Sequence, residues 1–498
     1  MSMRNIVLSI LVAMMPVCAS YAQAEGPRER VIREIRSWVK DMEKDSVMSR
    51  AAWSLTVRDV KDGSVVVEKD PEMLLAAASI TKLLTTGAAL EYVGADFCYE
   101  TRLEYVGEVK DSTLYGTLYI VGGGDPTLGS TYDEFKETAS SSVVFEQWKK
   151  ALAASGIARV EGRVVADERY FAFEPAISSW SWDDVSQTFG TGVRGLSYHD
   201  NLVKIFIKPG AEVGVAPVVD STYPSIHNLE VKNDAVTVDK GYNTMWIENS
   251  PLHMGHYFLH GNMPIKYDSR RITVPNRAAG LSLAVEFMEY MAGVSSPDGI
   301  EYELWDSSTQ VVDTLEHTHI HTYRSPALSE IAAVTNKYSD NMFAETILRT
   351  IGKVSGRGDS TGSALKKERE ILDSIAPGVE LINQLDGSGL SRNASLCTEY
   401  YTRYLYGMSK TGAFDAFYNS LAVPGEAGTY RSSLKDVPTR SRLHLKSGSL
   451  SIARATAGYA GEGDDMLCFS LIVNRYSNGS VVKKRMEQLL EILSRYAN

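Results

Sequence analysis

Ser79-Ile80-Thr81-Lys82 opens an apolar stretch, rich in Ala, Leu and Thr, that continues to residue 90. Its composition predicts a buried helix, preceded by a hairpin whose strands, 53–57 and 64–67, flank a turn at Gly63. A serine hydroxyl becomes a good nucleophile only with a base within hydrogen-bonding distance. A lysine three residues later on a helix lies on the same face, and burial lowers its pKa so that it can accept the proton. The segment therefore predicts Ser79 as nucleophile and Lys82 as base.

This four-residue pattern is weak evidence by itself. Ser-Xaa-Xaa-Lys also begins at four other serines, namely Ser37, Ser363, Ser432 and Ser480. A serine at the start of a helix can also be an ordinary N-cap. Only Ser79 opens an apolar helix directly after a hairpin, whereas the other four lie in charged or turn-like segments. The assignment of Ser79 therefore depends on further motifs.

A second motif, Ser339-Asp340-Asn341, lies in a turn between two stretches with helical spacing. The Ser339 hydroxyl can relay a proton, and the Asn341 amide can bind a substrate carbonyl and hold the catalytic lysine. The alternative is that these residues only cap the helix expected over 341–351. Ser391-Arg392-Asn393 shows the same three-residue pattern elsewhere in the chain. Ser339 and Asn341 therefore gain weight only together with the other motifs.

A third motif, Lys446-Ser447-Gly448-Ser449, has a rival in Lys410-Thr411-Gly412. Both offer a cation, a hydroxyl and a glycine, which together suit a carboxylate that approaches the backbone. Alternating residues around Lys446 predict an edge strand beside which a peptide can lie. Lys410 instead falls in a turn between helical stretches at 400–406 and 414–418. We therefore assign 446–449 to the site and interpret 410–412 as a chance match.

These three motifs, in this order, resemble those of the class C low-molecular-mass penicillin-binding proteins, a family of D-alanyl-D-alanine carboxypeptidases and endopeptidases related in fold to serine β-lactamases. Further segments that resemble the family lie at 123–128, 180–184, 336–345 and 386–392. The resemblance implies an α/β fold, with a discontinuous transpeptidase-like domain interrupted by inserted β-rich domains. It also implies an acyl-enzyme on Ser79, peptidoglycan stem peptides as substrate, β-lactams as inhibitors and no cofactor.

The resemblance extends to two recognition residues. Arg392 resembles an arginine that helps to recognise the peptide stem, and Asp167 resembles an acidic residue that reaches in from the inserted domain. The alternative for Arg392 is an ordinary surface ion pair with Asp386. The chain departs from the family at Ser447, where threonine is more usual, and at Ser451, which is smaller than the family's side chains at that position. The second departure leaves side-chain specificity open.

The pattern of residue types along the chain predicts four regions. The first region, residues 1–24, is a signal peptide. The transpeptidase-like domain is expected in two parts, 25–100 and 266–498, and the inserted β-rich domains are expected over 101–265. The insert shows short alternating strands separated by Gly, Pro and Asp turns, with one helical stretch at 132–154. Helical spacing returns at 278–291, 327–335, 341–351 and 483–496, and 468–473 is typical of a core strand. That strand and the last helix are expected to pack beside the first hairpin.

The N-terminus predicts export. Arg4, an apolar run over 6–17 and Ala22-Gln23-Ala24 match the regions of a cleaved secretory signal, which indicates a periplasmic protein. No later run reaches the roughly 18 apolar residues of a membrane anchor. The alternative is a lipoprotein attached through Cys18.

Charge and metal-ligating residues narrow the function further. A net charge of −11 disfavours nucleic acid and anionic membranes as partners. His317, His319 and His321 alternate, but no acidic or cysteine ligand lies at metal-site spacing, so we predict no metal. The mature chain keeps three cysteines, Cys98, Cys397 and Cys468, and their spacing suggests no pair. The sequence therefore leaves open whether two of them form a disulfide.

Two other functions compete with a D-alanyl-D-alanine peptidase. A β-lactamase or esterase on the same fold would need fast deacylation, and the large insertion argues against it. A wall-binding protein with a decayed site is disfavoured because all three motifs are intact. The sequence leaves open the preference for carboxypeptidase or endopeptidase substrates, the diamino acid of the stem, and whether the protein is a monomer or a homodimer.

Overall fold

The computed structural model describes residues 26–250, 255–295, 297–309, 315–463 and 465–496. The predicted signal peptide, 1–24, lies outside the described residues, as does Cys18. Among the described residues, no helix is long and apolar enough to cross a membrane. Cys98, Cys397 and Cys468 are free thiols, so the disulfide left open by the sequence is not formed.

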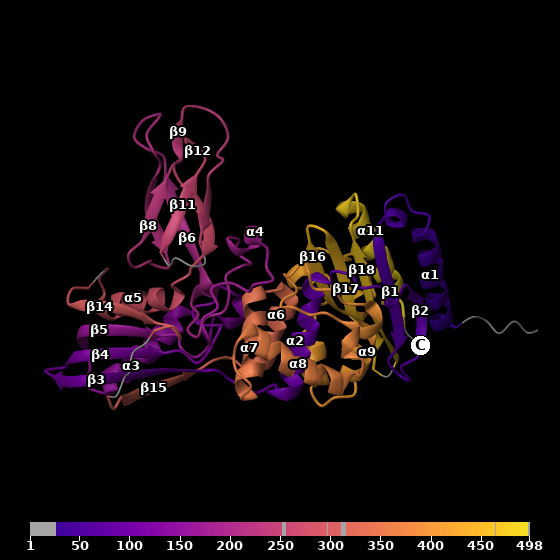
Figure 1. Ribbon diagram of the computed structural model, residues 1–498, viewed down its shortest axis with the longest axis horizontal. Coiled ribbons are helices and arrows are strands. Elements are labelled where there is room, and N and C mark those ends of the chain that lie inside the picture. The colour runs from indigo at the N-terminus through magenta and orange to yellow at the C-terminus, as the bar shows by residue number, and fades with distance from the viewer. Residues whose placement is uncertain (1–25, 251–254, 296, 310–314, 464, 497–498) are drawn as a thin grey trace, which may run out of the picture.

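The two ends of the chain build one antiparallel sheet (Figure 1). Its strand order is β16-β17-β18-β1-β2. The strands are β1 (Ala52–Asp59), β2 (Val65–Lys69), β16 (Leu443–Leu450), β17 (Ala453–Glu462) and β18 (Asp465–Asn474). β1 pairs with β18 along its whole length, so the hairpin near the start of the chain lies beside the C-terminal strand, as predicted. Strand β16 is at the edge, also as predicted.

Helices cover both faces of this sheet. On one face, α1 (Pro27–Met42) and α11 (Gly479–Ser494) pack over alternate strand residues such as Leu55 and Leu471. The buried side chains of α1 recur every three or four residues, which is the spacing of one helix face. Around the core on the other face lie α2 (Lys82–Tyr92), α6 (Leu328–Tyr338), α7 (Asn341–Val354), α8 (Thr361–Ile375), α9 (Thr398–Met408) and α10 (Phe414–Asn419). The result is a three-layer α/β/α domain.

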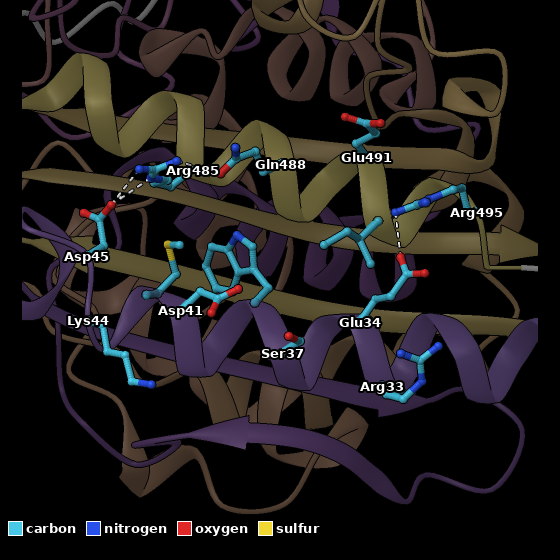
Figure 2. A pocket seen from close by; sticks show the side chains of 13 residues that line it. Arg33, Glu34, Ser37, Asp41, Lys44, Asp45, Arg485, Gln488, Glu491 and Arg495 are labelled. Carbon is cyan, nitrogen blue, oxygen red and sulfur yellow. Dashed lines mark hydrogen bonds and ion pairs between the residues drawn. The ribbon is translucent and has the colours of Figure 1, made fainter.

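Ion pairs join the two outer helices (Figure 2). Arg485 of α11 pairs with Asp45, just after α1, at 2.7 Å, and Arg495 pairs with Glu34 of α1 at 2.7 Å. Between them lies a cavity of about 630 Å³, lined mainly by charged side chains. None of its lining residues belongs to the three predicted motifs.

A second sheet is inserted between α2 and α6. Its order is β14-β5-β4-β3-β15, and α3 (Ser141–Ala154) and α5 (Ala279–Ala292) pack against it through buried side chains such as Trp148 and Phe287. The strands are β3 (Glu100–Lys110), β4 (Thr113–Val121), β5 (Arg159–Asp167), β14 (Ile300–Trp305) and β15 (Thr318–Arg324). A short helix, α4 (Trp182–Val185), follows β5.

A third, smaller module is nested within the second. It projects from the rest of the molecule (Figure 1) and has its own core, which includes Val203, Ile205, Leu259 and Met263. Its strands are β6 (Leu202–Lys208), β7 (Val218–Tyr223), β8 (Glu230–Asn233), β9 (Val236–Val238), β10 (Trp246–Asn249), β11 (His256–His260), β12 (Asn262–Pro264) and β13 (Arg270–Pro275).

Strand pairing corrects the predicted end of the insert. β13 pairs with β6, β14 with β5, and β15 with β3, so the inserted sheets continue to Arg324 and not to residue 265. Helix α5, predicted to belong to the transpeptidase-like domain, packs in the core of the inserted sheet. The sequence pattern predicted this helix but neither β13 nor β14, and a pattern does not reveal which partner an element packs against.

Candidate active site

Ser79 lies on a tight turn and not within an α-helix. Residues Ala78–Thr81 form one turn of 3₁₀-helix that runs directly into α2 at Lys82. Ala78 has φ +52°, a left-handed conformation that is strained for a residue with a Cβ and that recurs at functional sites. Ser79 is partly exposed, whereas the Lys82 side chain is completely buried. Lys82 Nζ donates to Ser79 Oγ at 3.0 Å, so the predicted nucleophile and base are in contact.

Two further acceptors hold the Lys82 ammonium. Nζ donates to Asn341 Oδ1 at 2.6 Å and to the Ser388 carbonyl at 2.7 Å. Burial lowers the pKa of Lys82 to about 8, although the carboxylates of Asp386 and Glu345 oppose the shift. A lysine with this pKa can give up its proton near neutral pH and act as a base.

A carboxylate places the Ser388 carbonyl. Glu345 of α7 accepts from the Gly387 amide at 2.9 Å and from the Ser388 amide at 2.8 Å. Burial and the neighbouring Asp386 raise the pKa of Glu345. The sequence flagged the segments 336–345 and 386–392 only through the family resemblance. It did not identify Ser388, because a backbone carbonyl has no side-chain signature.

The Ser339-Asp340-Asn341 turn connects α6 to α7. Ser339 has φ +66°, and Asp340 caps α7 because its Oδ1 accepts from the Phe343 amide at 2.9 Å. The sequence left open that this motif only caps the helix. The residue that caps α7 is Asp340, whereas Asn341 is the first residue of the helix. Tyr132, from the inserted segment, donates to the other oxygen of Asp340 at 2.9 Å.

Lys446 approaches the same turn from the edge strand β16. Its buried ammonium donates to Ser339 Oγ at 2.9 Å and to the Ser447 carbonyl at 2.7 Å. Burial and the charge of Lys82 lower the pKa of Lys446 well below its usual value. The five predicted catalytic residues, from three separate segments of the chain, thus form two hydrogen-bonded groups, one of Ser79, Lys82 and Asn341 and one of Ser339 and Lys446, which meet at the Ser339-Asp340-Asn341 turn.

Strand β16 passes very close to the nucleophile's turn at Gly448. A Cβ on Gly448 would lie 2.7 Å from the Ala77 carbonyl oxygen, closer than van der Waals contact allows. Ser447 Oγ donates to Thr429 Oγ1 at 2.7 Å, and Ser449 is exposed. A cavity of about 310 Å³ adjoins these hydroxyls and is lined in part by Thr429, Ser447, Ser449 and two cations, Arg454 and Lys483. The hydroxyls and the two cations suit an anionic group, and the carboxylate of Glu487 also lines the cavity. No sequence motif pointed to Thr429.

The profile of the D-Ala-D-Ala carboxypeptidase 3 (S13) family matches residues 35–496, nearly the whole described chain. The chain belongs to this family. That finding confirms the family resemblance and the D-alanyl-D-alanine peptidase activity predicted from the three motifs.

Relatives and solved structures agree with this membership. A D-alanyl-D-alanine carboxypeptidase from Actinomadura sp. (strain R39) is 26% identical over 92% of this S13 chain and 83% of its own length. DacB from Haemophilus influenzae is 22% identical over 86% of each chain. The crystal structure of penicillin-binding protein 4 from H. influenzae has a TM-score of 0.74 at 17% identity, covering 91% of this chain and 97% of its own. The predicted fold class is thereby confirmed.

The rival Lys410 motif lies outside the site of this S13 protein. Lys410 follows α9 and its Nζ donates to the Val60 carbonyl at 2.9 Å. The histidines of β15 are also apart from the site: His317 pairs with Glu104, and the strand shifts register between His319 and His321. The described residues contain no group of three or more side chains arranged to hold a metal ion.

Arg392 and Asp167 each form an ion pair with a neighbouring side chain. Arg392 pairs with both oxygens of Asp184 at 2.8 and 2.9 Å, and not with Asp386. The Asp167 carboxylate is occupied by the guanidinium of Arg169 at 2.6 and 2.8 Å. The acidic residue of the insert that contacts Arg392 is Asp184, which lies in the segment 180–184 that resembles the family. The recognition role of Asp167 stays a prediction.

Proposed function

We propose that Ser79 carries the acyl-enzyme of a periplasmic D-alanyl-D-alanine peptidase acting on peptidoglycan stem peptides. The observation that carries this proposal is the contact between Ser79 Oγ and the buried Lys82 Nζ at 3.0 Å. A lysine whose pKa is lowered to about 8 can take the serine proton as the hydroxyl attacks.

In the acylation step, Ser79 Oγ attacks the carbonyl carbon between two D-alanines and its proton passes to Lys82. Backbone N–H groups of Ser79 and Ser449 would stabilise the oxyanion. The proton on Lys82 then passes to Ser339 as Ser339 gives its own proton to the leaving amine and the C–N bond breaks, which leaves Lys82 neutral again. The ammonium of Lys446, 2.9 Å from Ser339 Oγ, supports this relay. Terminal D-alanine leaves, and water hydrolyses the ester on Ser79.

Substrate recognition is divided between the edge strand and the insert. Lys446, Ser447, Gly448 and Ser449 would hold the terminal carboxylate, with the backbone of β16 beside the peptide. Arg392, oriented by Asp184, would face the stem of the peptide. Ser447 keeps the hydroxyl that this role requires.

A β-lactam presents a strained amide and a carboxylate in the same arrangement as the peptide, and should therefore acylate Ser79. Penicillin treatment followed by peptide mass spectrometry tests this expectation. The expected result is one adduct on the peptide that contains Ser79, absent from Ser79→Ala. An unmodified Ser79 peptide, or a label on another residue, would contradict the proposal. Hydrolysis of cross-linked and of pentapeptide muropeptides by the same preparation decides between endopeptidase and carboxypeptidase preference.

A further inference from the structure

The loop after α4 carries the carbonyl that fixes the Asn341 amide. Asn341 Nδ2 donates to the Phe189 carbonyl at 2.9 Å, while Asn341 Oδ1 accepts from Lys82 Nζ at 2.6 Å. A side-chain amide can rotate by half a turn and exchange its oxygen with its NH₂ group. Here the rotated amide would direct N–H groups at the Lys82 ammonium and its oxygen at the Phe189 carbonyl. The Phe189 carbonyl therefore selects the orientation in which Asn341 can hold Lys82.

A buried arginine outside the site holds this loop. Arg277, between β13 and α5, is 1% exposed. Its guanidinium donates to the carbonyls of Val185 at 2.6 Å, Thr191 at 2.9 Å and Gly190 at 3.2 Å. These three carbonyls flank Phe189 on both sides. One side chain thus closes the loop that presents the Phe189 carbonyl to Asn341.

Arg277 makes these bonds as an unpaired cation. In the part of the chain that the structure describes, no ion pair joins it to a carboxylate, and burial together with the charge of Arg194 lowers the pKa of Arg277 to about 9. Burial of a charge without a counter-ion is costly, and the carbonyls of the loop provide its polar partners. The planar fork places its N–H donors on separate nitrogens, so Nη1 and Nη2 of Arg277 reach carbonyls at different points of the loop.

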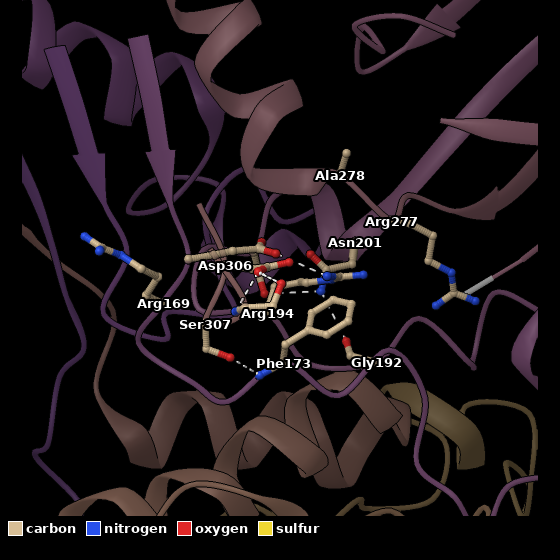
Figure 3. A network of polar contacts seen from close by, with 12 residues as sticks. Arg169, Phe173, Gly192, Arg194, Asn201, Arg277, Ala278, Asp306 and Ser307 are labelled. Carbon is tan, nitrogen blue, oxygen red and sulfur yellow. Dashed lines mark hydrogen bonds and ion pairs between the residues drawn. The ribbon is translucent and has the colours of Figure 1, made fainter. Parts of the chain in front are cut away.

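The neighbouring contacts show that the loop is tightly closed. Figure 3 shows Arg277 beside Ala278, at the start of α5, with its guanidinium apart from the cluster around Arg194. Arg194 pairs with Glu168 at 3.1 Å and so fixes the far end of the same loop. A Cβ on Gly190 would lie 2.1 Å from the Asp184 carbonyl oxygen, so the loop has no room to adjust at that position.

We propose that Arg277 is a positioning residue for acylation. It acts through the Phe189 carbonyl and Asn341 to keep Lys82 beside Ser79, although it touches neither the substrate nor the reacting atoms. This inference rests on the proposed roles of Ser79 and Lys82. It makes the inserted segment a working part of the site, since Arg277 and Phe189 both belong to the insert.

The test compares acylation of the full-length protein by a fluorescent penicillin in two backgrounds. Arg277→Met should lower the second-order acylation constant by about tenfold or more, because small displacements of catalytic groups have effects of this size. In an Asn341→Ala background, Arg277→Met should lower the acylation constant by less than about a further twofold. The reason is that Arg277 acts through Asn341, so its effect is lost when Asn341 is absent. Equal losses in the two backgrounds would overturn the proposal.

Arg349→Met is the matched control. Arg349 is also 1% exposed and donates to two backbone carbonyls, those of Asp359 and Ala172, but to none in the Phe189 loop. It should keep the wild-type acylation constant within about twofold at a temperature where it is folded. A loss equal to that of Arg277→Met would show a general effect of removing a buried arginine and would also overturn the proposal.

A second variant and a second readout separate positioning from loss of folding. Gly190→Ala disturbs the same loop without changing charge and should reproduce the acylation loss of Arg277→Met. Both variants should move the acid limb of the acylation pH profile to lower pH, because the Lys82 ammonium loses an ordered acceptor. An unshifted limb in both variants contradicts the proposal. Acylation of the wild type at Ser79 reports separately on the proposed function.

Discussion

Lys82 is the residue whose chemistry depends most directly on its surroundings. Its side chain is completely buried, and burial outweighs the attraction of Asp386, Glu345 and Asp340 in setting its pKa. The base is active only when neutral, so acylation should become faster as pH rises and should level off near the pKa of about 8. Below that pH the rate should change about tenfold per unit.

Stopped-flow acylation by a fluorescent penicillin between pH 5.5 and 9 measures this profile. Far-UV circular dichroism over the same range serves as the control, because it shows whether the protein stays folded. A rate that does not change between about pH 6 and 8 would contradict the assignment of Lys82 as base.

At the scale of single residues, the sequence identified the functional groups that belong to side chains. Ser79, Lys82, Ser339, Asn341 and Lys446 were each predicted from a motif, and the structure brings them into two hydrogen-bonded groups that meet at the Ser339-Asp340-Asn341 turn. It did not identify acceptors that belong to the backbone. The Ser388 and Phe189 carbonyls are supplied by the fold, and no residue type encodes them.

Among the elements, the edge strand β16 sets the distance between the proposed carboxylate-binding motif and the proposed nucleophile. Gly448→Ala should slow acylation by about tenfold or more, because a Cβ 2.7 Å from the Ala77 carbonyl forces the strand away from the Ser79 turn. Gly412→Ala, in the rejected motif, is the matched control, since nothing lies within 4 Å of a Cβ there. Both rates are measured with a fluorescent penicillin. Equal slowing by the two substitutions would contradict this role of β16.

Tyr132 joins the insert to the N-terminus of α7. Tyr132→Phe should lower the free energy of unfolding by about 1–3 kcal/mol, because the half-buried Asp340 oxygen loses its donor. Tyr338→Phe should change it by less than about 0.5 kcal/mol, because its hydroxyl bonds the exposed Glu134. Urea unfolding of both variants gives the comparison. Similar changes in the free energy of unfolding for the two variants would show that the Tyr132–Asp340 hydrogen bond stabilises the fold no more than an exposed one does.

Element types were easier to predict than element partners. The spacing of apolar residues predicted the helices that became α5, α6, α7 and α11, because that spacing reflects which face is buried. It could not separate α5, which packs on the inserted sheet, from α6, which packs in the transpeptidase-like core. The predicted boundary at 266 moved to about residue 324 for this reason.

For the molecule as a whole, the core of the projecting module is separate from the others. This core, around Leu259, shares no buried residue with the cores on the two faces of the first sheet or with the core of the second sheet. Catalytic geometry, by contrast, depends on a few contacts between the insert and the site, chiefly at Phe189, Asp184 and Tyr132. We therefore expect the stability of the projecting module to vary independently of acylation.

Two cavity-forming substitutions at completely buried leucines test this independence. Leu259→Ala and Leu471→Ala should each cost about 2–5 kcal/mol within their own core. Penicillin bound at Ser79 stabilises only the unit that holds it. Calorimetry is run with and without penicillin. Leu471→Ala should lower the midpoint temperature of the transition that penicillin raises. Leu259→Ala should lower the midpoint temperature of a transition that penicillin leaves unchanged. A single transition lowered by both substitutions would instead mean that insert and transpeptidase-like domain unfold together, and that the contacts at Phe189, Asp184 and Tyr132 couple the modules in stability as well as in catalysis.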